Sequence, residues 1–245
     1  ILCSMKNKLC ALLLCLLTTS VFGQDQLYKV VLYRAAPGKL LELIDEIKKD
    51  VNNHEALGME QPYLLRHSQG DHWDLMLIFP IESLEVYFTT DQQQIRKGSQ
   101  TLEKPYGDIF HDLLSYQEEA FVKGPAADVF ETAFGSNNFY HIEIFSALAG
   151  KQTELLDQRE AENRFYAHLN HPPNLIFTRV LGPSWDIFTI GAYKSLQAYA
   201  DDGGVTLEME DAAAKKAGFK GVKFIGSYLR SLLLEHHDTL ANKVN

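Results

Sequence analysis

Cysteine is absent from most of this chain. Its three cysteines, Cys3, Cys10 and Cys15, all lie close to the start. A folded region without cysteine has no disulfide, no thiolate metal site and no cysteine nucleophile. That region must therefore depend on an ordinary hydrophobic core, which a chain of 245 residues is long enough to bury.

Long apolar runs are also scarce, and the prominent one lies at residues 9–17. A short basic stretch that begins at Met5 precedes it, and Val21 and Gly23 follow at positions typical of a cleavage site before Gln24. This order is typical of a secretory signal peptide, which is too short to span a membrane. We expect residues 1–23 to be removed, and the mature protein to be exported, periplasmic or secreted, without stable membrane insertion.

Basic residues are outnumbered. The sequence has 23 Lys and Arg against 32 Asp and Glu; without Lys6 and Lys8 of the leader, 21 basic residues remain and the net charge is −11 with histidine neutral. A negative surface does not attract nucleic acid or anionic membranes. We therefore expect a small-molecule partner and no nucleic acid, and the charge leaves self-association open.

Tryptophan is rare too, and its two positions reveal an internal repeat. Trp73-Asp74 and Trp185-Asp186 stand 112 residues apart, and other matches occur at the same offset without a gap. The matching segments are Tyr28 with Tyr140, Gly38-Lys39 with Gly150-Lys151, Glu42-Leu43 with Glu154-Leu155, Gly70 with Gly182, Ser83-Leu84 with Ser195-Leu196, Tyr87 with Tyr199, and Ser115-Tyr116 with Ser227-Tyr228. This period exceeds the roughly 20–50 residues of a solenoid repeat, so it indicates a duplicated domain-sized unit. We expect units at 24–125 and 126–245.

Each unit shows the same order of predicted elements. Alternating Val, Leu and Tyr predict a first strand, and apolar residues at helical spacing then predict a helix. In unit one the predicted strands are 28–34, 63–67, 72–79 and 116–122, with helices from 40 and from 83. In unit two they are 140–145, 175–180, 184–190 and 228–240, with helices from 151 and 195 and over 206–216. The order β-α-β-β-α-β is that of the ferredoxin-like unit, so the fold class is α+β.

This tandem pattern resembles the dimeric α/β-barrel superfamily, and its two-unit form looks closest to NIPSNAP-like members. The resemblance rests on topology and on the strand-Gly-Lys-helix openings, and it covers most of residues 28–240. It implies two ferredoxin-like units that join their sheets into one barrel with helices outside. The superfamily includes monooxygenases and haem-binding peroxidases and chlorite dismutases. Since no catalytic motif matches residue by residue, the resemblance implies architecture rather than activity.

Strand alternation predicts which side chains of the third strands face the barrel interior. Trp73, Leu75, Leu77 and Phe79 form a uniformly apolar face, which we expect to meet the helices. Asp74 then lies inward with Met76. Asp186, the residue 112 positions after Asp74, is expected to lie inward as well. Both tryptophans are expected to be buried between sheet and helices.

The same argument applied to the first strands directs Tyr140, Ile142 and Ile144 to the helices. His141, Glu143 and Phe145 are then expected to face inward, and their counterparts in unit one are Lys29, Val31 and Tyr33. The predicted interior pocket has polar groups beside an apolar wall of Tyr33, Met76, Phe145 and Phe188. The alternative is that these charges lie at solvated strand ends or form structural ion pairs.

Histidines are predicted to gather at one end of unit two. The helix returns to the start of its strand, and the last strand ends there, which brings together His141, His168, His171, His236, His237 and Asp238. Such a group could ligate a divalent metal or a haem iron, although neither is favoured and no cofactor is assigned. Alternation favours His237 over His236 as the inward residue. The alternative is a helix terminus and strand end with no ligand.

Three functions remain open. The first is an exported small-molecule-binding barrel with an interior pocket and no assigned reaction. The second is an oxidoreductase, monooxygenase-like or haem-dependent, that uses the same pocket. The third is a non-catalytic interaction module.

Overall fold

A computed structural model of the chain describes residues 26–56, 59–98, 112–201 and 203–244. The expected signal peptide lies outside these residues. Unit one consists of β1 (Gln26–Ala35), α2 (Leu40–Ala56), β2 (Tyr63–Gln69), β3 (Leu75–Ile81), α3 (Leu84–Tyr87), α4 (Thr90–Gly98) and β4 (Leu114–Gly124). Unit two, after α6 (Ala127–Ser136), consists of β5 (Phe139–Ala147), α7 (Gln152–His168), β6 (Leu175–Leu181), β7 (Ile187–Tyr193), α8 (Leu196–Ala200), α9 (Leu207–Lys216), the 3-10 turn η1 (Val222–Phe224), α10 (Ile225–Arg230) and β8 (Leu233–Lys243).

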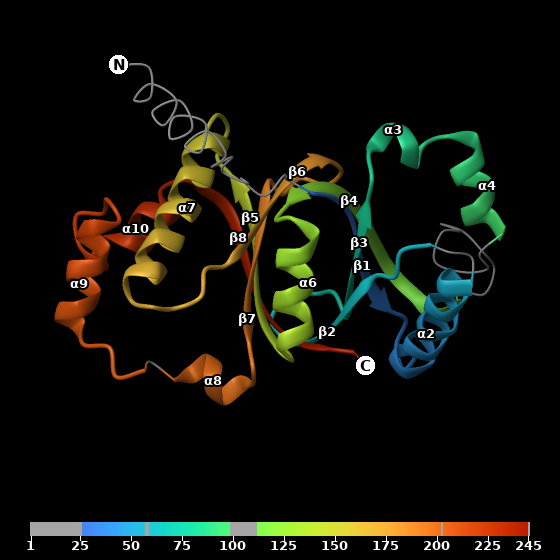
Figure 1. The fold of residues 1–245 in the computed structure, drawn as a ribbon, viewed down its shortest axis with the longest axis horizontal. Coiled ribbons are helices and arrows are strands. Elements are labelled where there is room, and N and C mark those ends of the chain that lie inside the picture. Colours follow the sequence, from blue (N-terminus) through green and yellow to red (C-terminus); the bar gives the residue numbers. More distant parts are fainter. Residues whose placement is uncertain (1–25, 57–58, 99–111, 202, 245) are drawn as a thin grey trace, which may run out of the picture.

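The eight strands form one closed antiparallel barrel in the order β1-β3-β2-β8-β5-β7-β6-β4. Two joints link the units: β2 pairs with β8, and β4 pairs with β6. Figure 1 shows α2, α3 and α4 on one flank of the barrel and α7, α9 and α10 on the other. The predicted α+β class and two-unit barrel are confirmed, and no helix among the described residues is both long and apolar enough to cross a bilayer.

The β2–β3 and β6–β7 hairpins each cross onto the last strand of the other unit. A Cβ atom on Gly70 would lie 2.0 Å from the carbonyl oxygen of Asp238, and one on Gly182 would lie 2.6 Å from that of Glu119. Both glycines have positive φ, 125° and 126°. Only glycine fits this contact, because backbone meets backbone and a side chain is excluded by space and by conformation.

The barrel interior is filled by alternate strand residues from both units. Tyr28, Val30 and Leu32 of β1 pack there with Tyr140, Ile142 and Ile144 of β5. Helix α6 adds Phe130 and Phe134 to this cluster. The opposite faces of the same strands pack on the outer helices, with Val31 and Tyr33 against α2 and Phe145 against α7.

This arrangement corrects the predicted faces of the first strands. Tyr140, Ile142 and Ile144 face inward, whereas His141, Glu143 and Phe145, with Lys29, Val31 and Tyr33, lie on the helix side. The prediction was wrong because both faces of these strands are largely apolar, so hydrophobicity alone does not distinguish them. In the third strand, Leu75, Leu77 and Phe79 do pack on the helices and Met76 and Ile78 inside.

Both tryptophans are buried, but they belong to the interior cluster and not to the helix face. They precede β3 and β7, where the chain turns out of the hairpin and simple alternation no longer holds. The predicted apolar wall is likewise split: Met76 and Phe188 are inside, and Tyr33 and Phe145 are outside.

The offset of the repeat changes before the last strand. Leu114 of β4 and Leu233 of β8 occupy equivalent register positions, paired with Ala35 and Ala147, and they stand 119 residues apart. Ser227-Tyr228 lies in α10 and does not match Ser115-Tyr116 of β4. The strand predicted from 228 therefore starts later, at Leu233. With this shift, the equivalents of His236, His237 and Asp238 in unit one are Gln117, Glu118 and Glu119.

Candidate functional site

The space between the sheet and the first long helix differs between the two units. In unit one its buried residues include the apolar Val31, Ile47 and Leu77, with two buried charged residues, Lys29 and Asp50. The residues 112 positions after the three apolar ones are Glu143, Arg159 and Thr189, all of them buried. Buried charge is costly unless it is paired, so polar residues at three positions of this kind indicate a specialised site in unit two.

Arg159 of α7 is the centre of this site. Its side chain is 1% exposed; Nη1 lies 3.6 Å from Glu143 Oε2, and Nη2 pairs with Glu162. Its Nε donates to Gln158 Oε1 at 2.7 Å, and its guanidinium lies over the Phe145 ring at 4.7 Å. The guanidinium thus connects a carboxylate on the sheet with one on the helix.

Two histidines and an aspartate complete the group on the sheet. His141 Nε2 lies 3.0 Å from Asp238 Oδ1. His236 Nε2 lies 3.3 Å from Glu143 Oε1 and 3.6 Å from Asp238 Oδ1. The His236 ring stacks on Phe145 with centroids 4.7 Å apart, which fixes its plane. We call His141, Glu143, Arg159, Glu162, His236 and Asp238 the polar cluster.

The charges of the polar cluster shift the pKa values of its members. Burial alone would lower the pKa of His141, but the hydrogen bond to Asp238 and the charge of Glu143 raise it above its ordinary value. The hydrogen bond from His141 lowers the pKa of Asp238. Burial opposes ionisation of Glu143, yet His236 and Arg159 hold its pKa below the usual range. An imidazolium between carboxylates is therefore favoured, which is suited to proton transfer.

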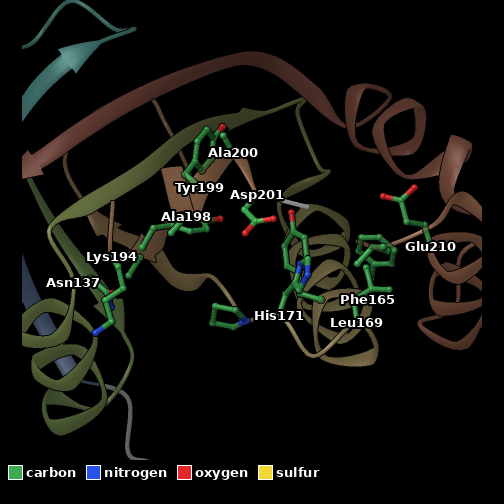
Figure 2. A pocket seen from close by; sticks show the side chains of 15 residues that line it. Asn137, Phe165, Leu169, His171, Lys194, Ala198, Tyr199, Ala200, Asp201 and Glu210 are labelled. Atoms are coloured by element: carbon green, nitrogen blue, oxygen red, sulfur yellow. The ribbon is translucent and has the colours of Figure 1, made fainter. Parts of the chain in front are cut away.

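A cavity of about 530 Å³ lies between α7, α8 and the end of β7, and its lining contains none of the polar cluster. Figure 2 shows Phe165 and Leu169 on its α7 side and Lys194 and Ala198 on the opposite side. Tyr199 in its wall lies 5.4 Å from the His141 ring. Tyr166, also in the wall, donates its hydroxyl to Glu162 Oε1 at 3.0 Å. Two tyrosines thus connect the cavity with the polar cluster.

Unit one has a simpler counterpart. Lys29 Nζ lies 3.5 Å from Glu119 Oε2 and 5.7 Å from the Tyr87 ring centroid. These three residues correspond to His141, Asp238 and Tyr199, and a cavity of about 690 Å³ adjoins Tyr87. The cation, carboxylate and tyrosine are thus present in both units, and unit one has a buried arginine of its own, Arg96, over the Tyr87 ring. The two histidines belong to unit two within the described residues.

The structure brings together only some of the predicted site residues. His141, Glu143, His236 and Asp238 converge, but on the helix side of the sheet and not in the interior. His237 faces the barrel interior, as predicted, with Nδ1 3.4 Å from Asp71 Oδ1, but His141 lies on the opposite face, so His236 and not His237 joins it. His168 is exposed at the end of α7, and His171 lines the cavity; neither joins the group of closely spaced ligand atoms.

Asp74 and Asp186 have a structural role. Asp74 Oδ2 accepts from the backbone N–H of Ala35 at 2.8 Å, and Asp186 Oδ2 accepts from that of Ala147 at 2.9 Å. Arg179 Nη2 donates to Asp186 Oδ1 at 2.8 Å. These carboxylates extend the strand pairing beyond β3 and β7, so they are no part of the polar cluster.

Sequence reasoning missed Arg159, Glu162, Tyr166 and Tyr199 as site residues. The repeat contained a signal for Arg159. Its counterpart Ile47 belongs to an apolar helix face, and an arginine at a core position is a departure that needs a reason.

The residues present suit a divalent cation better than a haem. Ligand atoms of His141, Glu143 and Asp238 lie within 4.8 Å of one another, close enough to share one ion once the His141–Asp238 hydrogen bond opens. A haem iron needs an imidazole nitrogen free to bind it. His141 Nε2 is hydrogen-bonded to Asp238 and His236 Nε2 faces Glu143, so a haem iron would have to displace a carboxylate, whereas a divalent cation would be bound by the carboxylate as well.

Comparison with known proteins identifies the fold. No family model matches the sequence, and no curated protein matches it. An anthrone oxidase-like protein of known structure aligns over 92% of this chain and 93% of its own, with 12% identity and a TM-score of 0.58. A candidate chlorite dismutase aligns over 90% and 95%, with 10% identity and a TM-score of 0.50.

A candidate monooxygenase from Lactobacillus acidophilus covers 89% of this chain and 93% of its own at 9% identity, but its TM-score of 0.47 is too low to support an argument. At these identities the matches establish architecture alone. The NIPSNAP-like resemblance stays a prediction. The chain has the fold of the dimeric α/β-barrel superfamily, with both barrel halves in one polypeptide.

Proposed function

We propose that the protein binds a small aromatic molecule with hydroxyl or carbonyl groups in the unit-two cavity, against the polar cluster. The observation that carries this proposal is the replacement of the apolar core positions Val31, Ile47 and Leu77 by Glu143, Arg159 and Thr189 in unit two. A fold that needed only stability would be served by the apolar set that unit one already has.

The walls of the cavity support this ligand class. Phe165, Tyr166, Tyr193 and Tyr199 supply aromatic surface, and the volume of about 530 Å³ is in the usual range for small-molecule sites. Tyrosine hydroxyls and the nearby polar cluster supply donors and acceptors that orient a ligand.

An oxidoreductase is the second candidate. The observation that favours it is the His141–Asp238 pair beside the cavity, since a histidine oriented by a carboxylate is a common general base. His141 in its neutral form, which predominates only above its raised pKa, would take a proton from the bound molecule, and dioxygen would be the oxidant that accepts the electrons. The shared fold with an anthrone oxidase-like protein agrees with this candidate and does not establish it.

The test for binding is isothermal titration of the protein with anthrone. We expect saturable binding by the wild type and at least a tenfold loss of affinity in His141→Ala. The matched control is His168→Ala, a histidine exposed at the end of α7, which should bind as the wild type does. Equal affinity of all three proteins would contradict the proposal.

Two further measurements separate the candidates. Dioxygen consumption with anthrone, lost in His141→Ala and kept in His168→Ala, would support the oxidoreductase, whereas binding without consumption leaves the binding function alone. Titration with hemin should give no Soret band of a histidine-ligated haem, and a stable band would contradict our assignment of His141 and His236.

We further propose that the mature protein is exported and begins at Gln24. Mass spectrometry of the protein recovered outside the cytoplasm should give the mass of 24–245, without the cysteines of the leader. A mass that includes Cys10 or Cys15 would refute this.

A further inference from the structure

Trp73 has an unsatisfied buried donor at one end of the barrel. The residue is 0% exposed, and among the described residues its indole Nε1 has no hydrogen-bond partner. His67 lies beside it with ring centroids 5.7 Å apart, and His67 Nε2 is likewise buried without such a partner. Two adjacent orphan groups are unusual, because a buried donor that is left unpaired loses its hydrogen bond to water without a replacement.

The other tryptophan shows what this position ordinarily requires. Trp185 Nε1 donates to Glu118 Oε1 at 2.8 Å, and Glu118 Oε2 accepts from the Tyr116 hydroxyl at 2.8 Å. Glu118 comes from β4 of unit one, so each hairpin tryptophan meets the last strand of the other unit. The donor at Trp185 is therefore satisfied by a carboxylate.

The equivalent carboxylate is missing at Trp73. Glu118 pairs with Leu32 on β1, and His237 pairs with Ile144 on β5, two positions 112 residues apart. His237 therefore occupies the place of Glu118. An acceptor for the tryptophan has been replaced by an imidazole, which is a donor when it is protonated.

The surroundings of His237 open one side of the corner to solvent. Asp71, whose side chain is 5% exposed, contacts His72 Nδ1 at 2.6 Å and His237 Nδ1 at 3.4 Å. The Asp71 carboxylate is thus in contact with two imidazoles. The side chains of His72 and His237 are 48% and 46% exposed, so the corner opens to solvent on their side.

We propose that this corner, formed by His67, Asp71, His72, Trp73 and His237, binds a small carboxylate. The ligand takes the place that the Glu118 carboxylate has at Trp185, and it accepts from Trp73 Nε1 and from the imidazole of His67 or His237. The corner lies on the inner face of the sheet, whereas the polar cluster lies on the helix face. This site is therefore independent of the proposed function.

The experiment uses the two indole N–H resonances of 15N-labelled protein, with Trp73→Phe identifying the one that belongs to Trp73. Sodium acetate is titrated at constant ionic strength against sodium chloride. We expect a saturable shift of the Trp73 resonance with acetate and none with chloride, while the Trp185 resonance, already bonded to Glu118, stays in place.

The decisive variant is His237→Glu, which recreates the Trp185 arrangement with an internal carboxylate. It should abolish the acetate response of Trp73. His168→Ala removes an exposed histidine at the end of α7, outside the corner, so it should keep the response. The proposal is overturned if acetate leaves the Trp73 resonance unmoved, if His237→Glu responds as the wild type does, or if a crystal grown with acetate shows a single water between Trp73 and His67.

Discussion

The two halves of this barrel differ most clearly at single residues. Unit two keeps the backbone plan of unit one, yet Arg159 stands where unit one has Ile47, and Glu143 stands where it has Val31. A buried ion pair is weak evidence for stability, because its desolvation offsets the attraction of the charges. The polar cluster is therefore better explained by function than by the needs of folding.

Removal of Arg159 should reveal the free-energy cost of burying the carboxylates without their cation. Arg159→Ile leaves Glu143 and Glu162 buried without their cation, and we expect a loss of about 3–5 kcal/mol in the free energy of unfolding. The double variant Arg159→Ile with Glu143→Val copies the unit-one pair and should recover most of the loss. Urea denaturation measures both, and no recovery in the double variant would contradict this account of the pair.

The His141–Asp238 pair predicts a pH-dependent contribution to stability. The raised pKa of His141 means that its contribution is present below the unfolded value of about 6.5 and is lost as the pH rises through the folded value. The lowered pKa of Asp238 means that its contribution is present above about 3.9 and is lost as the pH falls through the folded value.

The pair should accordingly stabilise most between about pH 4 and pH 6.5. The difference in melting temperature between the wild type and His141→Ala is the measurement, taken from pH 4 to pH 9. A difference that grows towards pH 9 would have the wrong sign.

At the scale of elements, the hairpins join the two units. Gly70 brings the β2–β3 hairpin onto the backbone of β8, and Gly182 brings β6–β7 onto that of β4. Ser68 Oγ adds a hydrogen bond to the carbonyl oxygen of Leu240 at 2.8 Å. These crossings also place Trp73 and Trp185 beside the last strand of the opposite unit.

Gly70→Ala should therefore be costly. Its Cβ would meet the Asp238 carbonyl oxygen at 2.0 Å in addition to the strain of φ 125°, and we expect a loss of more than about 2 kcal/mol in the free energy of unfolding. Gly150→Ala is the matched control, since it also has positive φ (79°) but meets nothing within 4 Å. The control should lose about 1 kcal/mol. Equal losses would show that conformation, and not the close contact, decides the cost.

At the scale of the whole molecule, the closed sheet makes the two units interdependent. The interior cluster contains residues of both units and of α6, and the β2–β8 and β4–β6 joints complete the sheet. We expect one cooperative unfolding transition, with coincident midpoints by tryptophan fluorescence and far-ultraviolet circular dichroism. Two separated transitions would show that each unit is stable by itself.

Much of this architecture follows from the sequence. The 112-residue repeat, with its two Trp-Asp pairs, predicts the duplication, and the strand and helix order predicts the ferredoxin-like units. Ser83 and Ser195, at the predicted helix starts, accept from the backbone N–H groups of Val86 and Ala198. These features are local, so short-range patterns are enough to reveal them.

Other features depended on contacts that no local pattern contains. The sequence by itself determined part of the site, since His141, Glu143, His236 and Asp238 were all candidates and Arg159 and Glu162 were not. Only the tertiary structure decided that they meet on the helix face, because both faces of β5 are apolar enough to be buried. It also decided the choice between His236 and His237, since the repeat shifts by seven residues before β8 and a strand presents neighbouring side chains to opposite sides.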